Sequence, residues 1–150
     1  VYVVENPAVF SSVLDQMGSE RGVGRRHEFS LVCTYGQVKI AGLVLLDLLA
    51  KEDQEIYYSG DFDPEGLLIA DRLKRRYGEK LKLWRYNAKD YENAKSHELI
   101  GDSRMRKLEK IQDQELVGLG DVMRAAGVTG YQERIVDALM YDLTHVCDKG

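Results

Sequence analysis

The sequence has little cysteine and proline, no long apolar run and no excess of positive charge. Its 150 residues include two cysteines, Cys33 and Cys147, and two prolines. The cysteines are far apart and lack metal-ligand spacing, which argues against a cysteine-based metal site and fits a reduced, cytoplasmic compartment. No apolar run reaches membrane-spanning length and no signal peptide is visible, so we expect no membrane partner.

The net charge of −4 argues mildly against tight nucleic-acid binding by this chain alone, because nucleic-acid binders usually carry a basic face. Basic residues nevertheless gather in three groups, within residues 21–27, 72–82 and 104–107. Taken singly, each group fits an ordinary solvated surface.

Strands and helices are expected to alternate along the first half of the chain. Apolar and β-branched runs predict strands at 1–5, 28–34, 54–60 and 81–86. Strands alternating with helices are typical of a parallel sheet with right-handed crossovers. The sequence therefore predicts an α/β fold of Rossmann-like type, with a four-stranded, mainly parallel sheet flanked by helices.

Helices are expected between these strands. Asn6-Pro7 and Asp63-Pro64 each combine a capping residue with proline at the first helical position. The segment 38–50 is apolar on nearly all sides, so we expect that helix to be well buried.

The last third of the sequence shows little strand signal. Helical patterns cover 103–111, 113–126 and 130–143. We expect residues 91–150 to form a helical extension packed on a core of residues 1–90, within one domain. The sequence begins directly in a strand without an initiator Met, so we also expect a longer parent protein with further N-terminal domains.

Two strand-to-helix junctions carry carboxylates in the same position. Glu5 follows the first strand, and Asp61 and Asp63 follow the third. Ligands of open α/β sheets bind at the carboxyl ends of the strands, where strand order reverses. If the first and third strands are neighbours, the three carboxylates converge and repel one another unless a cation neutralises them. A hard divalent cation such as Mg²⁺ suits such ligands and would screen an incoming phosphodiester.

Several residues at these junctions have an ordinary structural interpretation as well. Asp63-Pro64-Glu65 is a normal helix start, although this explains neither Asp61 nor Glu5. Glu65 is either a second metal ligand or, as we favour, an acid in the first helical turn. Gly66 either packs tightly or lets a substrate approach. Gly36 and Gln37, in the turn after the second strand, are weak candidates for substrate contacts.

The junctions resemble a known family. Val4-Glu5-Asn6-Pro7-Ala8-Val9-Phe10 is similar to the first motif of the toprim domain in topoisomerase VI A subunits and meiotic double-strand-break proteins. Asp61-Phe62-Asp63-Pro64-Glu65-Gly66 resembles the second motif of that domain. Thr34-Tyr35-Gly36-Gln37 resembles the glycine turn between them, with Val38 where relatives often have proline. The complete pattern looks most like the C-terminal toprim-like domain of a bacterial family related to the nuclease subunit of the Wadjet plasmid-defence system.

The resemblance implies Mg²⁺-dependent cleavage of nucleic acid, either by a DNA nuclease or by topoisomerase-like strand cleavage, with DNA as the expected partner and plasmid or phage defence as the setting. It implies that Glu5 is a general acid or base, that Asp61 and Asp63 bind Mg²⁺, and that Mn²⁺ can substitute. It also implies a homodimer, or association with other subunits through the parent protein. In the topoisomerases, the attacking tyrosine belongs to a separate domain.

Two other functions are compatible with these residues. One is a non-catalytic module that keeps the fold to bind DNA or a protein partner. The other is a haloacid-dehalogenase-like phosphatase, which also uses Asp-x-Asp after a strand. In that family the motif follows the first strand, whereas here it follows the third and would leave Glu5 without a role.

Overall fold

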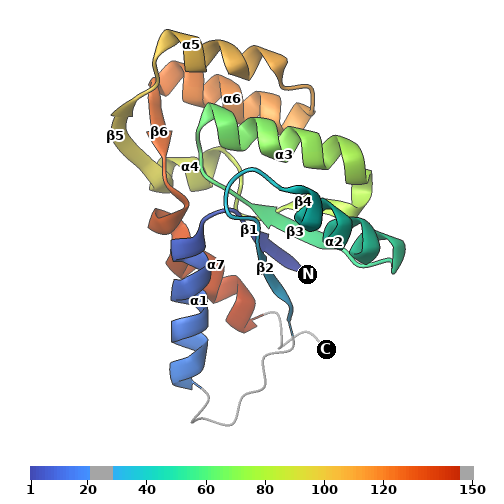
Figure 1. Ribbon diagram of the computed structural model, residues 1–150. Coiled ribbons are helices and arrows are strands. Elements are labelled where there is room, and N and C mark those ends of the chain that lie inside the picture. The colour runs from blue at the N-terminus through green and yellow to red at the C-terminus, as the bar shows by residue number, and fades with distance from the viewer. Residues whose placement is uncertain (21–28, 146–150) are drawn as a thin grey trace.

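The protein combines a parallel sheet with helices and a second, smaller sheet (Figure 1). The structure is a computed structural model that describes residues 1–20 and 29–145. The basic group at 21–27, the first residue of the strand expected at 28–34, and Cys147 lie outside the described residues. Within the described residues, no helix is both long and apolar enough to cross a membrane.

The main sheet confirms the α/β fold expected from the sequence. In the described part of the chain it contains four strands, all parallel, in the order β2-β1-β3-β4. These strands are β1 (Tyr2–Val4), β2 (Leu31–Cys33), β3 (Ile56–Ser59) and β4 (Leu81–Leu83). Val4 pairs with Ser59 of β3, so the first and third strands are neighbours. Strand order reverses at β1, which places the switch point between β1 and β3.

Capping explains where two of the flanking helices begin. In α1 (Pro7–Glu20), the Asn6 side chain accepts a hydrogen bond from the backbone N–H of Ala8 at 2.8 Å. In α3 (Pro64–Tyr77), the Asp63 side chain accepts one from the Gly66 N–H at 2.7 Å. Proline follows each capping residue in the chain. Both helices therefore start directly after the carboxylate-bearing junctions, as the sequence predicts.

The helix expected to be well buried is instead largely exposed. Helix α2 (Ile40–Lys51) connects β2 to β3, and Leu46 is its one fully buried residue. Ile40 is 82% exposed and Leu48 is 55% exposed. The prediction was wrong because an apolar composition indicates only that a helix favours burial. It does not indicate how much of the helix surface packs against the rest of this chain.

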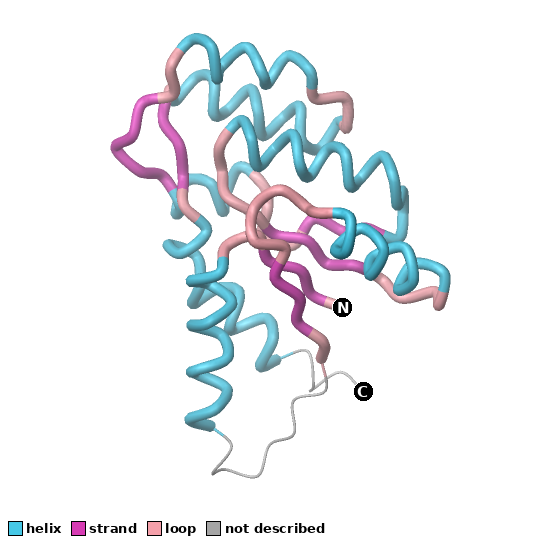
Figure 2. The backbone as a smooth tube through the Cα atoms, viewed as in Figure 1, coloured by secondary structure: helices cyan, strands magenta, loops and turns pink. Residues whose placement is uncertain are grey.

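The extension after β4 is not purely helical, which corrects the sequence prediction. It includes α4 (Ala88–Ala94) and an antiparallel pair of strands, β5 (Lys95–Leu99) and β6 (Val128–Gly130), drawn apart from the main sheet in Figure 2. All three elements were missed because α4 is short, β5 is largely polar and exposed, and β6 is only three residues long. Gly130 was expected to begin a helix, but its backbone pairs with Phe62 through two hydrogen bonds of 2.9 and 2.8 Å.

Helical segments make up the rest of the extension, close to the expected ranges. In chain order these segments are α5 (Asp102–Met105), η3 (Arg106–Lys110), α6 (Gln114–Ala126), η4 (Gln132–Ile135) and α7 (Val136–His145). A further short 3-10 helix, η2 (Gly78–Lys80), lies before β4. In Figure 1, α6 lies beside α3, and α7 lies beside α1.

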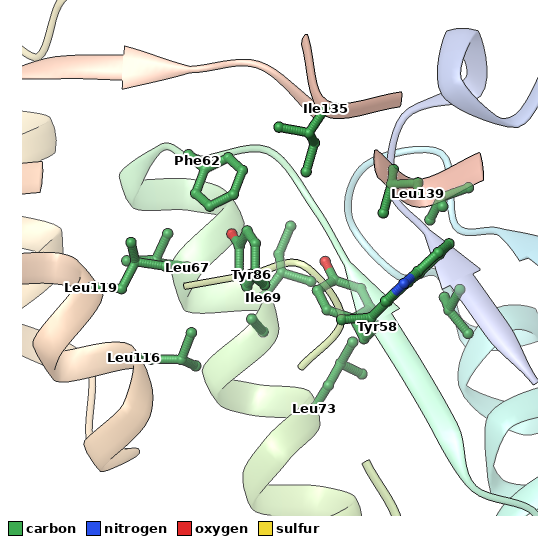
Figure 3. Close-up of a cluster of buried hydrophobic side chains, with 14 of the residues drawn as sticks. Tyr58, Phe62, Leu67, Ile69, Leu73, Tyr86, Leu116, Leu119, Ile135 and Leu139 are labelled. Atoms are coloured by element: carbon green, nitrogen blue, oxygen red, sulfur yellow. The ribbon is translucent and has the colours of Figure 1, made fainter. Parts of the chain in front are cut away.

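The core joins the sheet to the extension. Figure 3 shows Tyr58 of β3 and Leu67 of α3 in one cluster with Leu116 of α6 and Leu139 of α7. All four side chains are fully buried. The Trp84 indole and the Arg85 guanidinium also donate hydrogen bonds to the Asp142 carboxylate of α7, at 2.9 and 2.7 Å.

Asp71 provides a test of how strongly the extension is attached. This fully buried residue of α3 accepts hydrogen bonds from the backbone N–H groups of Gln112 and Asp113, at 2.8 and 2.9 Å. Asp71→Ala leaves both donors without a partner, so we expect the free energy of unfolding to fall by about 2–4 kcal/mol. Urea unfolding measures this change.

Asp71→Asn is the matched control, because its amide oxygen still accepts from both donors although the ion pair with Arg75 is lost. We expect this variant to lose less than half as much stability as Asp71→Ala. A stability of Asp71→Ala within about 0.5 kcal/mol of wild type would contradict the attachment inferred here.

Candidate active site at the β1–β3 edge

Three carboxylates meet at the carboxyl ends of β1 and β3, as the sequence predicts. We call Glu5, Asp61 and Asp63 the acidic cluster. The Glu5 N–H donates to the Ser59 carbonyl at 3.1 Å, which extends the β1–β3 pairing to the first member of the cluster. The negative charges of Asp61 and Asp63 both act on Glu5 and raise its pKa. Parallel pairing of the strands therefore brings the two junctions together.

Glu5 is the most deeply buried member of the cluster, with 7% of its surface exposed. Burial, followed by the charge of Asp61, raises the pKa of Glu5 from 4.5 to about 7. The Tyr58 hydroxyl donates to Glu5 Oε2 at 3.2 Å and opposes this shift. A Cβ atom on Gly60 would lie 2.6 Å from the same oxygen, so a larger residue at position 60 would displace the Glu5 carboxyl. The carboxyl of Glu5 can thus take up or release a proton near neutral pH.

Asp61 is held by contacts from the extension and from the loop after β4. Its Oδ1 accepts a hydrogen bond from the Gln132 N–H at 2.9 Å, and its carbonyl accepts one from the Tyr86 hydroxyl at 2.6 Å. Burial raises the pKa of Asp61, and the bond from Gln132 partly offsets this. The side-chain oxygen of Gln132 also accepts from the Asn6 N–H at 3.1 Å. Gln132 therefore connects the two junctions.

Asp63 and Glu65 share a cation from the extension. Arg104 Nη2 donates to Asp63 Oδ2 at 2.7 Å and to Glu65 Oε2 at 2.8 Å. Lys107 contacts the other oxygen of Glu65 at 2.7 Å. Burial raises the pKa of Asp63. Burial would also raise the pKa of Glu65, but the hydrogen bonds from Arg104 and Lys107 outweigh it and lower that pKa to about 2.

The fit of a divalent cation can be judged from these contacts. Within residues 1–20 and 29–145, no three His, Cys, Asp or Glu side chains form a metal-binding group by themselves. Mg²⁺ usually takes only one or two carboxylates and completes its coordination with water and substrate phosphate. Asp61 and Asp63 fit that smaller requirement. Arg104 already contacts Asp63 Oδ2, so a cation at that oxygen would share it with the guanidinium or displace it.

Buried polar atoms at the same edge also have unused hydrogen-bonding capacity. Thr34 follows β2, Ser59 ends β3, and Gln132 contacts Asp61. Thr34 Oγ1, Ser59 Oγ and Gln132 Nε2 are buried and have no hydrogen-bond partner among the described residues. Buried polar groups normally find partners, so this edge is suited to a polar ligand or hydrated ion.

The weaker candidates differ in how closely they approach the cluster. Gly36, with φ of 78°, donates its N–H to the Glu5 carbonyl at 3.2 Å, so its turn lies beside Glu5. Gln37 is exposed next to it. A Cβ on Gly66 would lie 2.3 Å from the Asp61 carbonyl oxygen, so packing alone explains this glycine. Substrate contacts at all three positions, and a metal at Glu65, stay predictions.

The structure adds residues that the sequence analysis did not single out. Gln132 contacts Asp61 across 71 positions of sequence, and Arg104 contacts Asp63 across 41. Neither belongs to a motif with fixed spacing from the junctions. Arg104 was noted only as part of a basic group, and no sequence pattern indicated a role for Gln132.

The sequence of residues 1–143 matches the family described as Protein of unknown function C-terminus (DUF2399). The chain belongs to the DUF2399 family. The match covers the main sheet and most of the extension, including Arg104 and Gln132. A search of curated proteins found no match.

The tight packing in this DUF2399 domain predicts a large effect of Gly66→Ala. The added methyl group would collide with the Asp61 carbonyl, so α3 must shift and we expect stability to fall by about 2–4 kcal/mol. Thermal or urea unfolding measures this. Gly118→Ala in α6 is the control, because no atom lies within 4 Å of its added Cβ, and we expect that variant to be unchanged or slightly more stable. Equal stability of the two variants would contradict the close approach.

The raised pKa of Glu5 predicts a pH-dependent stability. Because this pKa is about 7 in the folded protein, above its ordinary value of 4.5, the fold favours the neutral carboxyl over the charged one. That contribution is complete below the unfolded pKa and is lost as pH rises through the folded pKa. Urea unfolding in EDTA should show Glu5→Gln gaining on the order of 2–3 kcal/mol relative to wild type between about pH 5 and about pH 8. Parallel stability curves for the two proteins would contradict the shift.

Proposed function

We propose that this DUF2399 domain is a toprim-like catalytic domain that cleaves phosphodiester bonds of nucleic acid, with DNA as its substrate, in a Mg²⁺-dependent reaction. The observation that carries the proposal is a buried Glu5, with a pKa of about 7, beside Asp61 and Asp63 at the switch point of the sheet. Catalytic groups with a pKa near the working pH transfer protons efficiently. The toprim resemblance of both junctions supports the same reaction, in the setting of plasmid or phage defence.

Each residue of the acidic cluster receives a role in this proposal. Asp61 and Asp63 hold Mg²⁺, for which Mn²⁺ can substitute. When bound, the metal neutralises charge on the phosphodiester and on the leaving oxygen. Glu5 accepts the proton of the attacking oxygen or donates a proton to the leaving oxygen. Attack of water on phosphorus breaks one P–O bond and yields a phosphomonoester end and a hydroxyl end.

Residues around the cluster position these groups. The Tyr58 hydroxyl orients Glu5 Oε2, and Gln132 and Tyr86 fix Asp61 through its side chain and its carbonyl. The first turn of α3 presents the positive end of the helix dipole at the same edge, which favours an anionic substrate. These contacts come from the protein itself and hold the carboxylates in place, which preorganises the site.

A second candidate function is a non-catalytic module that binds nucleic acid or a protein partner. One observation favours it: Arg104 and Lys107 form ion pairs with Asp63 and Glu65 and so already supply positive charge to these carboxylates. In that case the carboxylates would serve mainly to attach the extension to α3. Metal binding distinguishes the two functions.

Calorimetric titration of Mg²⁺ and Mn²⁺ into the wild type and into Asp61→Asn/Asp63→Asn tests the proposal. Asn keeps an oxygen that can accept from Gln132 and Gly66, so we expect the variant to fold but to bind neither metal. Glu79→Gln/Asp121→Asn is the matched control, because it removes two exposed carboxylates elsewhere and should bind metal as wild type does. Metal binding by the Asp61→Asn/Asp63→Asn protein at wild-type affinity would contradict the assignment.

Cleavage is tested with supercoiled and linear DNA in the presence of each metal. We expect activity in the wild type and a loss of at least about 100-fold in Glu5→Gln, because proton transfer by a positioned group contributes about 10²–10⁴-fold. Metal binding without cleavage under any of these conditions would favour the non-catalytic module.

A further inference from the structure

A groove with basic walls runs along α3, and its lining includes Glu65, two positions after Asp63. It has a volume of about 340 Å³. Its charged lining consists of Arg72 and Arg75 from α3, Lys107 and Lys110 from η3, and Glu65 at one end. We call Arg72, Arg75, Lys107 and Lys110 the basic groove. The groove therefore concentrates positive charge on a chain whose net charge is −4.

Two of the four cations have no partner in the described part of the chain. Arg75 pairs with Asp71 at 2.9 Å, and Lys107 pairs with Glu65 at 2.7 Å. Among residues 1–20 and 29–145, no acidic group forms an ion pair with Arg72 or Lys110, and both side chains are exposed. They come from different elements and line the same groove. Such a groove attracts an anion because its positive charge is not neutralised from within.

The basic groove is continuous with the candidate active site. Glu65 lines the groove and shares the Arg104 guanidinium with Asp63. Gln37, from the turn beside Glu5, also lines the groove. An anionic polymer that follows the basic groove therefore arrives at the acidic cluster.

The spacing of the α3 residues suits a chain of phosphates. Glu65, Arg72 and Arg75 are separated by seven and three positions, which places them on one face of the helix. A rise of about 1.5 Å per residue puts Glu65 and Arg75 about 15 Å apart along the axis. The two cations of α3, Arg72 and Arg75, are about 4.5 Å apart along the axis, which is close to the charge spacing of about 3.4 Å along one nucleic-acid strand.

We propose that the basic groove binds the phosphate backbone of one nucleic-acid strand and leads it to the acidic cluster. The proposal rests on the proposed function. It identifies cations that would bind the phosphates of the substrate beside the acidic cluster. No aromatic side chain lines the groove in the described chain, so stacking on bases does not contribute and recognition is independent of sequence.

Fluorescence anisotropy with a labelled single-stranded oligonucleotide of about 20 nucleotides tests the groove, in EDTA and at about 50 mM salt. We expect Arg72→Glu/Lys110→Glu to bind at least about 10-fold more weakly than wild type, because two contacts become repulsive. The dependence of log affinity on log salt should fall by about 1.4, since each lost contact to a single strand contributes about 0.7.

The matched control is Lys82→Glu/Lys89→Glu. These lysines lie on β4 and α4, outside the groove lining, and the two variants have the same net charge. We expect the control to stay within about 3-fold of wild type. Thermal unfolding of both variants checks that each is folded.

Three outcomes would overturn the proposal: no oligonucleotide binding by the wild type, no loss in the groove variant, or an equal loss in the control. Equal competition by polyglutamate and by unlabelled oligonucleotide of matched charge would also overturn it, because the groove would then select anions in general.

Calorimetric titration of Mg²⁺ distinguishes failure of the groove proposal from failure of the proposed cleavage function. We expect the groove variant to bind Mg²⁺ as wild type does. If the wild type binds the oligonucleotide but no metal, the groove proposal stands and the cleavage proposal fails.

Discussion

Parallel pairing of β1 with β3 is the constraint on which the candidate site depends. It aligns Val4 with Ser59 and so places Glu5 at the same edge as Asp61 and Asp63. Burying carboxylates together is unfavourable for their charged forms, because burial and mutual repulsion both oppose ionisation. The raised pKa values of all three groups express this cost. Capping of α3 requires Asp63 alone, so it does not account for Glu5 and Asp61 at the same edge.

The extension supplies the donors that make this arrangement stable. Gln132 donates to Asp61, and Arg104 donates to Asp63. The pairing of Phe62 with Gly130 attaches the loop between the two aspartates to β6. The geometry of the second junction is therefore set as much by residues after β4 as by the strand that precedes it. This dependence explains why the extension shares a hydrophobic core with the sheet instead of packing as a separate unit.

Local sequence signals predicted the features that depend on neighbouring residues. A capping residue followed by proline marked both helix starts, and apolar runs marked the strands of the main sheet. The exposure of α2 could not be predicted, because composition alone does not show what lies against a helix. Strands β5 and β6 are short, and one of them is largely polar, so their pairing depends on tertiary contacts. Gln132 and Arg104 escaped detection because they reach the cluster across 71 and 41 positions of sequence.

The late position of Gln132 and Arg104 has a consequence for how the protein is made. A ribosome releases the chain from its N-terminus, so all three carboxylates emerge before either donor. Until Arg104 emerges, Asp63 lacks the cation that lies beside it in the folded protein, so its buried charged form is not yet stabilised. The edge of the sheet therefore gains its last hydrogen bond to the acidic cluster only after Gln132 has been translated.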